Sequence, residues 1–144
     1  MTIEQLQKNL ESIDLKQIEA KVLKDLEPDI LDLNIDQLSK GEGASGSKLP
    51  KYASPEYEKG KRAEGLTEQA GSNYNILLTG DYREGMFLEQ KNNESFLNTD
   101  VGYKDRLNQL TDNDILGLQD NSMKGLEPQI IELTCEELEK QINK

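Results

Sequence analysis

The stretch MFLEQKNNESFLN, residues 86–98, decides the fold class, because it predicts a β-hairpin in a chain whose other patterns are mostly helical. Two short runs, Met86–Gln90 and Ser95–Asn98, flank the connection Lys91–Glu94. The two central residues of that connection are asparagines, which adopt a positive φ more readily than most residues. The chain holds only two valines, so we expect the sheet that contains this hairpin to be small.

A further short strand is predicted just before the hairpin. Tyr74–Leu78 is apolar and is followed by Thr79–Asp81, whose Thr-Gly-Asp sequence is a turn signal. We expect five large apolar side chains of these segments to form the buried side of the sheet. They are Leu77, Leu78, Phe87, Leu88 and Phe96.

The first forty residues have the periodicity of amphipathic helices. Thr2 and Gln5 stand at the spacing of a capping box, and apolar residues then recur every three or four positions. The apolar stripe changes phase after Asp14, which predicts a bend or two helices in tandem. Pro28 disfavours helix at the residue before it, and Asp29–Leu38 predicts a further short helix. These stripes serve either an ordinary core or the interface with a partner.

Two helices are predicted after the hairpin, Tyr103–Leu110 and Leu126–Ile142, with Pro128 in the first turn of the second. We therefore expect an α+β protein in which N- and C-terminal helices pack around a small antiparallel sheet, with a long central loop. The chain is expected to form a single structural domain, residues 1–144. It divides into a helical N-terminal part (1–40), an extended loop region (41–73) and a sheet with C-terminal helices (74–144).

The composition excludes several kinds of chemistry. The 144 residues include no His and no Trp, so the chain has no Ser–His or Cys–His catalytic pair and no imidazole metal ligand. Cys135 is the single cysteine, which excludes an internal disulfide and a cysteine-based zinc site. The formal charge of −11 repels nucleic acid and anionic membranes, so we expect no specific nucleic-acid binding.

The apolar content is low for a protein that folds alone. Leu, Ile, Val and Phe make up 35 of the 144 residues, just above the roughly 20% at which charged chains usually stay disordered. We therefore expect a thin core and a stability that comes partly from partners. The longest aliphatic run is residues 76–78, and the first residues do not resemble a signal peptide, so we expect no membrane segment.

One loop matches a dinucleotide-binding pattern without its context. Gly41–Gly46 reads GEGASG, which fits G-x-G-x-x-G, but Pro50 follows too closely for the required helix to begin. The same residues miss a P-loop, because Ser47-Lys48 reverses the required order of Lys and Ser. We interpret the segment as a loop and expect no cofactor.

Two acidic segments resemble calcium loops incompletely. Asp112–Gly117 lacks the glutamate at position twelve, where Met123 stands. Asp32, Asn34 and Asp36 also alternate, but this segment lacks the glycine and the glutamate that the loop requires. We interpret both segments as helix caps and solvated faces. No pair of carboxylates is singled out by its spacing for acid–base catalysis, so we expect no metal and no catalytic residue.

The central part contains the only basic stretch, Lys48–Arg62. Residues 41–65 carry a net charge of +1, whereas residues 1–40 carry −4 and residues 66–144 carry −8. We expect the loop Gly41–Arg62 to reach away and contact an adjacent subunit or ring; a solvated loop is the alternative. The candidate partner-contact residues are Lys48, Lys51, Tyr52, Tyr57, Lys59, Lys61 and Arg62.

Several short motifs within residues 30–120 point to one family. Asp32-Leu33-Asn34 and YASPEY, residues 52–57, precede NILLTGDY, residues 75–82, and then Thr99-Asp100 and ILGL, residues 115–118. The set resembles the small structural proteins of tailed bacteriophages, of the virion-morphogenesis, head–tail connector or tail-completion type common in phages of gut Bacteroidetes, including crAss-like phages. Its most specific element is Leu-Thr-Gly-Asp followed by an aromatic residue. The family usually has Phe-Gly-Leu-Thr where this chain has LGLQ, residues 116–119.

The resemblance implies a structural subunit without enzymatic activity, in a virion that assembles in the host cytoplasm. Such a subunit forms a homo-oligomeric ring in the neck, collar or tail, connects portal to tail, contacts neighbouring rings and surrounds passing DNA. An acidic subunit suits this channel, since carboxylates repel phosphates.

Two other functions are alternatives to a structural subunit. One is a small acidic phage protein that binds and regulates a host enzyme, by imitating the charge of DNA. The other is a metal-dependent enzyme that uses carboxylates alone, and no residue spacing supports it.

Overall fold

The computed structural model describes residues 1–50, 56, 59, 63, 84–102, 104–110 and 114–144. Helices from both ends of the chain pack with a two-stranded antiparallel sheet in this part, which confirms the α+β fold class. The predicted strand Tyr74–Leu78, with Leu77 and Leu78, lies outside the described residues. The elements are α1 (Ile3–Glu11), α2 (Leu15–Asp25), α3 (Glu27–Ser39), β1 (Met86–Lys91), β2 (Glu94–Thr99), α6 (Lys104–Leu110) and α7 (Asp120–Ile142).

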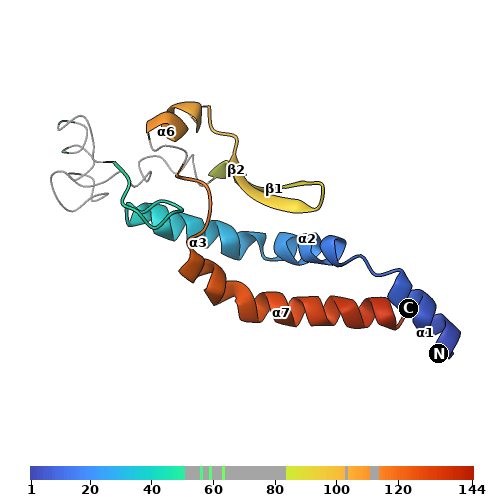
Figure 1. Ribbon diagram of the computed structural model, residues 1–144. Helices are drawn as coiled ribbons and strands as arrows, with labels where there is room; N and C mark the ends of the chain where they lie inside the picture. Colours follow the sequence, from blue (N-terminus) through green and yellow to red (C-terminus); the bar gives the residue numbers. More distant parts are fainter. Residues whose placement is uncertain (51–55, 57–58, 60–62, 64–83, 103, 111–113) are drawn as a thin grey trace.

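Helices α2 and α3 form the middle of the molecule (Figure 1). They follow one another in nearly the same direction, the hairpin β1–β2 lies along one side of them, and α7 runs back along the other side. Contacts of α2 with α7 and with β2, and of α3 with β1, hold these layers together. Helix α1 stands at one end of the molecule, beside the end of α7 (Figure 1).

The N-terminal helices begin where the sequence indicates. Thr2 and Gln5 form the predicted capping box at the start of α1. Helix α1 ends at Glu11. At the start of α2 the Asp14 side chain accepts hydrogen bonds from the backbone N–H groups of Lys16 and Gln17, at 3.0 and 3.2 Å. The change of phase after Asp14 therefore reflects two helices in tandem, as predicted. An aspartate at this position satisfies N–H groups that have no partner within the helix.

Pro28 lies in the first turn of α3 rather than at the end of a helix. A proline is tolerated there, because the first N–H groups of a helix have no intrahelical acceptor. Helix α3 spans Glu27–Ser39 and is slightly longer than the predicted helix Asp29–Leu38. The helix predicted over Tyr103–Leu110 is confirmed over Lys104–Leu110 as α6, and Tyr103 lies outside the described residues.

The hairpin has the predicted turn. Asn92 and Asn93 have φ values of 53° and 61°, so they form a two-residue connection with positive φ at both positions. In the resulting register Met86 pairs with Thr99 and Leu88 with Leu97. Met86, Leu88 and Thr99 are buried, whereas Leu97 is half-buried.

The predicted burial of Phe87 and Phe96 is wrong. Their exposed fractions are 36% and 48%, while Leu88 is buried as predicted. Successive side chains of a strand point to opposite faces of the sheet. Phe87 and Leu88 are neighbours, so they cannot share one face. The register opposite Leu88 places Phe96 on the outer face with Phe87.

Helix α7 begins at Asp120, earlier than the predicted start at Leu126, and runs to Ile142 as predicted. Pro128 therefore lies inside the helix, and its predicted place in the first turn is wrong. A proline has no N–H group, so the carbonyl of Lys124 loses its intrahelical partner. Both residues are exposed, so water can take the place of the missing donor.

The core of the described part is thin, as predicted, and consists of two small clusters. Eleven apolar residues of this part are buried. The first cluster joins α2, α3, β1 and α7 and contains Ile18, Val22, Leu26, Ile30, Leu88 and Leu126. The second lies near the end of α3 and contains Leu38, Leu49, Met86 and Ile115.

Two buried amides of α3 bind the segment that leads into α7. The Nδ2 group of Asn34 donates to the carbonyls of Ile115 and Gly117, at 3.1 and 2.7 Å. Gln37 donates to the same Gly117 carbonyl at 3.0 Å and accepts from the N–H of Gln119 at 2.8 Å. Asn34 is fully buried, so its interpretation as part of a solvated face is wrong. Side-chain amides serve these backbone groups because residues 115–119 belong to neither a strand nor a helix.

An ion pair between Lys21 and Glu137, with Nζ and Oε2 2.8 Å apart, connects α2 to α7. The hydrogen bond from Lys21 lowers the pKa of Glu137, and Lys140 at 3.6 Å adds to this effect. The same hydrogen bond raises the pKa of Lys21. A carboxylate with a lowered pKa stabilises the fold above its ordinary pKa, and this contribution is lost as the pH falls through the lowered value.

We therefore expect a pH-dependent difference in stability between the protein and its Glu137→Gln variant. The variant has the lower free energy of unfolding at neutral pH, and the difference shrinks as the pH falls below the ordinary glutamate pKa and through the lowered pKa of Glu137. Urea denaturation at a series of pH values measures it. The Glu136→Gln variant is the control, because Glu136 is an exposed neighbour on the same helix. A difference that stays constant with pH would contradict this role of the ion pair.

Candidate functional site

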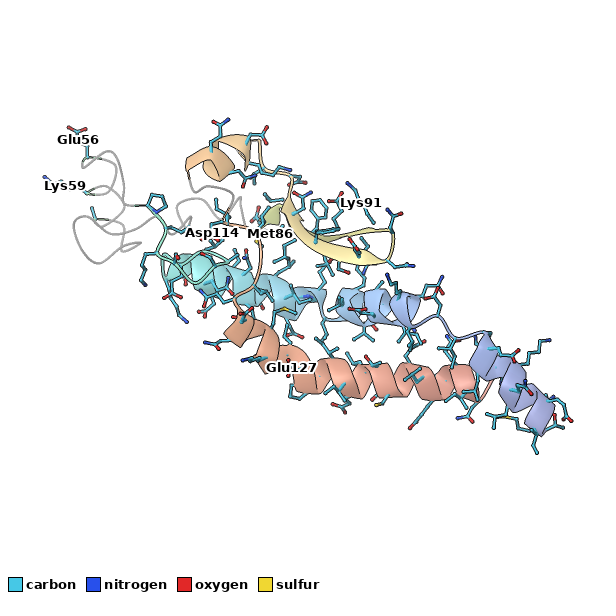
Figure 2. The ribbon with its side chains drawn as sticks, viewed as in Figure 1. Glu56, Lys59, Met86, Lys91, Asp114 and Glu127 are labelled. Atoms are coloured by element: carbon cyan, nitrogen blue, oxygen red, sulfur yellow. The ribbon has the colours of Figure 1, made fainter. Side chains whose placement is uncertain are left out.

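The glycine-rich loop after α3 is bound to Asp114 (Figure 2). The backbone N–H of Ser45 donates to Asp114 Oδ1 at 2.8 Å, and the Ser45 hydroxyl donates to Oδ2 at 2.7 Å. The N–H groups of Gly43 and Ala44 donate to the carbonyls of Ser47 and Asp114, at 2.9 and 2.8 Å. These are the amides that a dinucleotide phosphate requires in a G-x-G-x-x-G loop. Here the Ser45 amide donates to the Asp114 carboxylate instead of a bound anion, and the other two amides donate to carbonyls of the same chain.

Two glycines allow this loop and the segment 114–117 to approach each other closely. A Cβ atom at Gly43 would overlap the carboxylate of Asp114. Gly117 has a φ of 141°, and a Cβ atom there would lie 2.9 Å from that of Ala44. The pattern of glycines thus serves packing within the chain.

The first part of the predicted partner-binding loop belongs to the body of the protein. The N–H of Leu49 donates to the carbonyl of Gly41 at 2.7 Å, and the side chain of Leu49 is buried in the second cluster. The expectation that the loop reaches away is therefore wrong for residues 41–50. An apolar residue that has a core position within reach is buried there rather than presented to a partner.

Two of the seven candidate contact residues lie in the described part. The Lys48 Nζ is 3.1 Å from Glu42 Oε1. Hydrogen bonds from Gln119 and then from Lys48 lower the pKa of Glu42. Lys59 is exposed (Figure 2). Lys51, Tyr52, Tyr57, Lys61 and Arg62 lie outside the described residues, so their contact with a partner stays a prediction.

Helix α1 presents an apolar stripe that the described part of the chain leaves exposed. The exposed fractions of Ile3, Leu6 and Leu10 are 81%, 37% and 50%, and no residue of α1 is buried. These three residues are called the α1 stripe below. The Asn9 side chain anchors the helix, because its Nδ2 donates to the Ile142 carbonyl at 2.8 Å. The sequence shows this stripe but does not tell whether a core or a partner covers it.

Exposed apolar side chains concentrate at the N-terminal end. Nine large apolar side chains of the described part are exposed, and five of them lie within the first fifteen residues. These five are Met1, Ile3, Leu6, Leu10 and Leu15. The outer face of the hairpin adds Phe87 and Phe96. Scattered apolar residues are normal on a surface, but a stripe along one helix favours an interface.

A groove of about 440 Å³ lies between α3 and the first half of α7. It is called the α3–α7 groove below. Leu33 and Leu126 supply its apolar surface. Three aspartates of α3 line one wall, and small or amide side chains of α7 line the other. The wall residues are Asp29, Asp32 and Asp36 on α3, and Asn121, Ser122, Gly125 and Gln129 on α7.

The described residues show no cluster suited to a metal. No three carboxylate or thiol groups of this part are placed to hold an ion together. Cys135 is exposed on α7. In the same part of the chain, no helix has both the length and the apolar character that a membrane span needs.

Comparison with protein-family models, with curated proteins and with solved structures finds no match to this chain.

Proposed function

We propose that the protein is a structural subunit of a phage virion, in a neck, collar or tail ring that connects portal to tail and surrounds the DNA channel. The α1 stripe is the observation that carries this proposal. A helix whose apolar residues are all exposed in one chain completes its burial against another chain. The proposed subunit has no enzymatic activity.

The energetics favour association through the α1 stripe. Fully burying one aliphatic side chain contributes about 1.5–3 kcal/mol relative to leaving it exposed. Ile3, with an exposed fraction of 81%, has most of this gain still available, and Leu10, at 50%, has about half of it. A stripe that contacts a different surface of the next copy makes a heterologous interface, and repeated heterologous contacts close into a ring.

The charge and the sequence motifs support the proposal that this ring belongs to a virion. With a net charge of −11, the subunit repels the phosphates of DNA and lets DNA pass without binding it. The motifs shared with phage connector and tail-completion proteins, such as LTGDY at residues 78–82, support the neck or tail as its position. The portal and neighbouring rings are the proposed partners.

Native mass spectrometry of the purified protein, together with peptide mapping of intact virions, tests the proposal. We expect a homo-oligomer of defined size and peptides of this chain in purified particles. A monomer at all concentrations, together with its absence from virions, would end the structural interpretation. Stoichiometric capture of a nucleic-acid-binding host enzyme would instead favour the regulatory alternative, for which the acidic charge is the supporting observation.

A further inference from the structure

We propose that the α3–α7 groove binds the outer part of the basic stretch, residues 51–62, of a second copy of this chain; these residues are called the basic segment below. The inference rests on the proposed function, because it requires that copies assemble. It specifies two surfaces through which the copies contact each other and the chemistry of that contact. The α1 stripe and this groove would then be two different interfaces of one subunit.

The groove combines an apolar floor with one acidic wall. Asp29, Asp32 and Asp36 follow one another along α3 at spacings of three and four, so they share one face of the helix. Gly125 on the opposite wall has open space where a side chain would begin. A bound chain can therefore approach the backbone of α7 closely on that side.

Asp29 leaves the acidic wall with an unneutralised charge within the described part of the chain. Asp36 pairs with Lys40 at 2.7 Å, and both side chains are 59% exposed. Asp29 is exposed and forms no ion pair within the described part of the chain. A positive side chain from a partner thus finds an acceptor at Asp29. An exposed ion pair alone contributes only about 0–1 kcal/mol, so the apolar floor must supply the rest of the affinity.

The chemistry of residues 51–62 matches this groove. The segment carries four basic and two acidic side chains, whereas the rest of the chain is strongly acidic. It also contains Tyr52 and Tyr57, which suit an apolar floor with a polar rim. The α1 stripe fits less well, since Glu4 and Glu11 outnumber Lys8 on that helix. Charge complementarity therefore selects the basic segment as the occupant.

The position of the segment favours a contact between copies. Asp114 and the second cluster anchor residues 43–49 near the C-terminal end of α3. Figure 2 shows Lys59 beyond that end of α3 and away from α7. The basic segment of one copy and the groove of the next are different surfaces, so they form a heterologous contact.

Charge reversal with exchange of partners tests this contact. We expect Asp29→Lys and Lys59→Glu each to weaken self-association about tenfold, and an equimolar mixture of the two variants to recover part of it. Sedimentation velocity over a range of concentrations measures the association. Asp29→Lys lowers the net negative charge, so general repulsion alone would strengthen association. Weakening is therefore specific to the groove.

Matched controls change the same charges elsewhere. Asp105→Lys lies on α6, on the other side of α3 from α7 (Figure 1), and Lys16→Glu lies in the first turn of α2. We expect Asp105→Lys to weaken association less than Asp29→Lys, and Lys16→Glu to weaken it less than Lys59→Glu. If Asp29→Lys and Lys59→Glu assemble as well as these controls, the groove contact is wrong while the proposed function stands. If the unaltered protein is monomeric at all concentrations, the groove contact is wrong, and its absence from virions as well would end the proposed function.

Carbodiimide cross-linking of mixed ¹⁴N- and ¹⁵N-labelled chains identifies the geometry of the contact. We expect a link between Asp29 and Lys59 that contains one light and one heavy peptide. Links that join only peptides of the same label would show that the segment occupies the groove of its own chain. That result would overturn the inference.

Discussion

The Ile115→Ala variant is expected to lose about 2–5 kcal/mol of the free energy of unfolding. Ile115 has an exposed fraction of 0% and packs with Leu38, Leu49 and Met86 in the second cluster. Removing most of its side chain leaves a cavity among residues that come from three distant parts of the chain. The backbone of Ile115 is also fixed, because its carbonyl accepts a hydrogen bond from Asn34. The site therefore has little freedom to collapse around the smaller side chain.

Urea denaturation followed by circular dichroism measures this loss. Ile131→Ala is the control, since Ile131 is 63% exposed on α7 and its truncation should change the free energy of unfolding by less than about 0.5 kcal/mol. Similar losses in both variants would contradict the second cluster as a core. The comparison uses the same pair of residue types, so differences in side-chain chemistry do not enter.

The Ile3→Asp/Leu6→Asp double variant is expected to dissociate the assembly into monomers without unfolding the chain. Both residues belong to the α1 stripe, and neither is buried in the single chain. Covering two carboxylates with an apolar partner requires their desolvation, which costs several kcal/mol. In the free subunit the same carboxylates lie near the N-terminus of a helix, where negative charge is favourable.

Sedimentation velocity and far-ultraviolet circular dichroism separate the two effects. Lys8→Glu is the matched control, because it makes the same change of two charges on α1 outside the stripe. We expect this control to keep its oligomeric state. An assembly that survives the double substitution would show that the α1 stripe is not an interface. A loss of helical signal would show instead that α1 stabilises the single chain.

The hairpin and the helix starts could be predicted because local chemistry determines them. Asn92 and Asn93 adopt a positive φ more readily than other residues, and this fixes both the turn and the register of the strands. Asp14 satisfies N–H groups at the start of α2 whatever the rest of the chain does. Signals of this kind act within a few residues.

The errors concern features that depend on distant parts of the chain. Phe87 and Leu88 are both large and apolar, and only the position of α3 against the sheet decides which one is buried. The alternation of strand side chains could have shown that one of them must be exposed. The sequence favours a surface position for Asn34, and only the packing of the segment 115–119 against α3 shows that it is buried. Pro128 favours a late start of α7, near Leu126, whereas the helix begins at Asp120. The proline is tolerated inside the helix because its position is exposed.

The candidate site was only partly predictable for the same reason. A stripe of apolar residues has the same spacing whether a core or another molecule covers it, so the exposure of the α1 stripe needed the structure. The α3–α7 groove combines residues about ninety positions apart and has no local pattern. The charge of the basic segment could be read directly from the sequence, and charge is the basis of its proposed contact with the groove.

The packing of α7 against α2 has a consequence for synthesis on the ribosome. Ile18 and Val22 emerge early, but α7 contacts the helix that carries them and is translated long afterwards. Until then these side chains can pack only against α3 and the hairpin, on a nascent chain that cannot finish its core. Translation speed over the central region therefore sets how long the unfinished chain is vulnerable to aggregation and proteases.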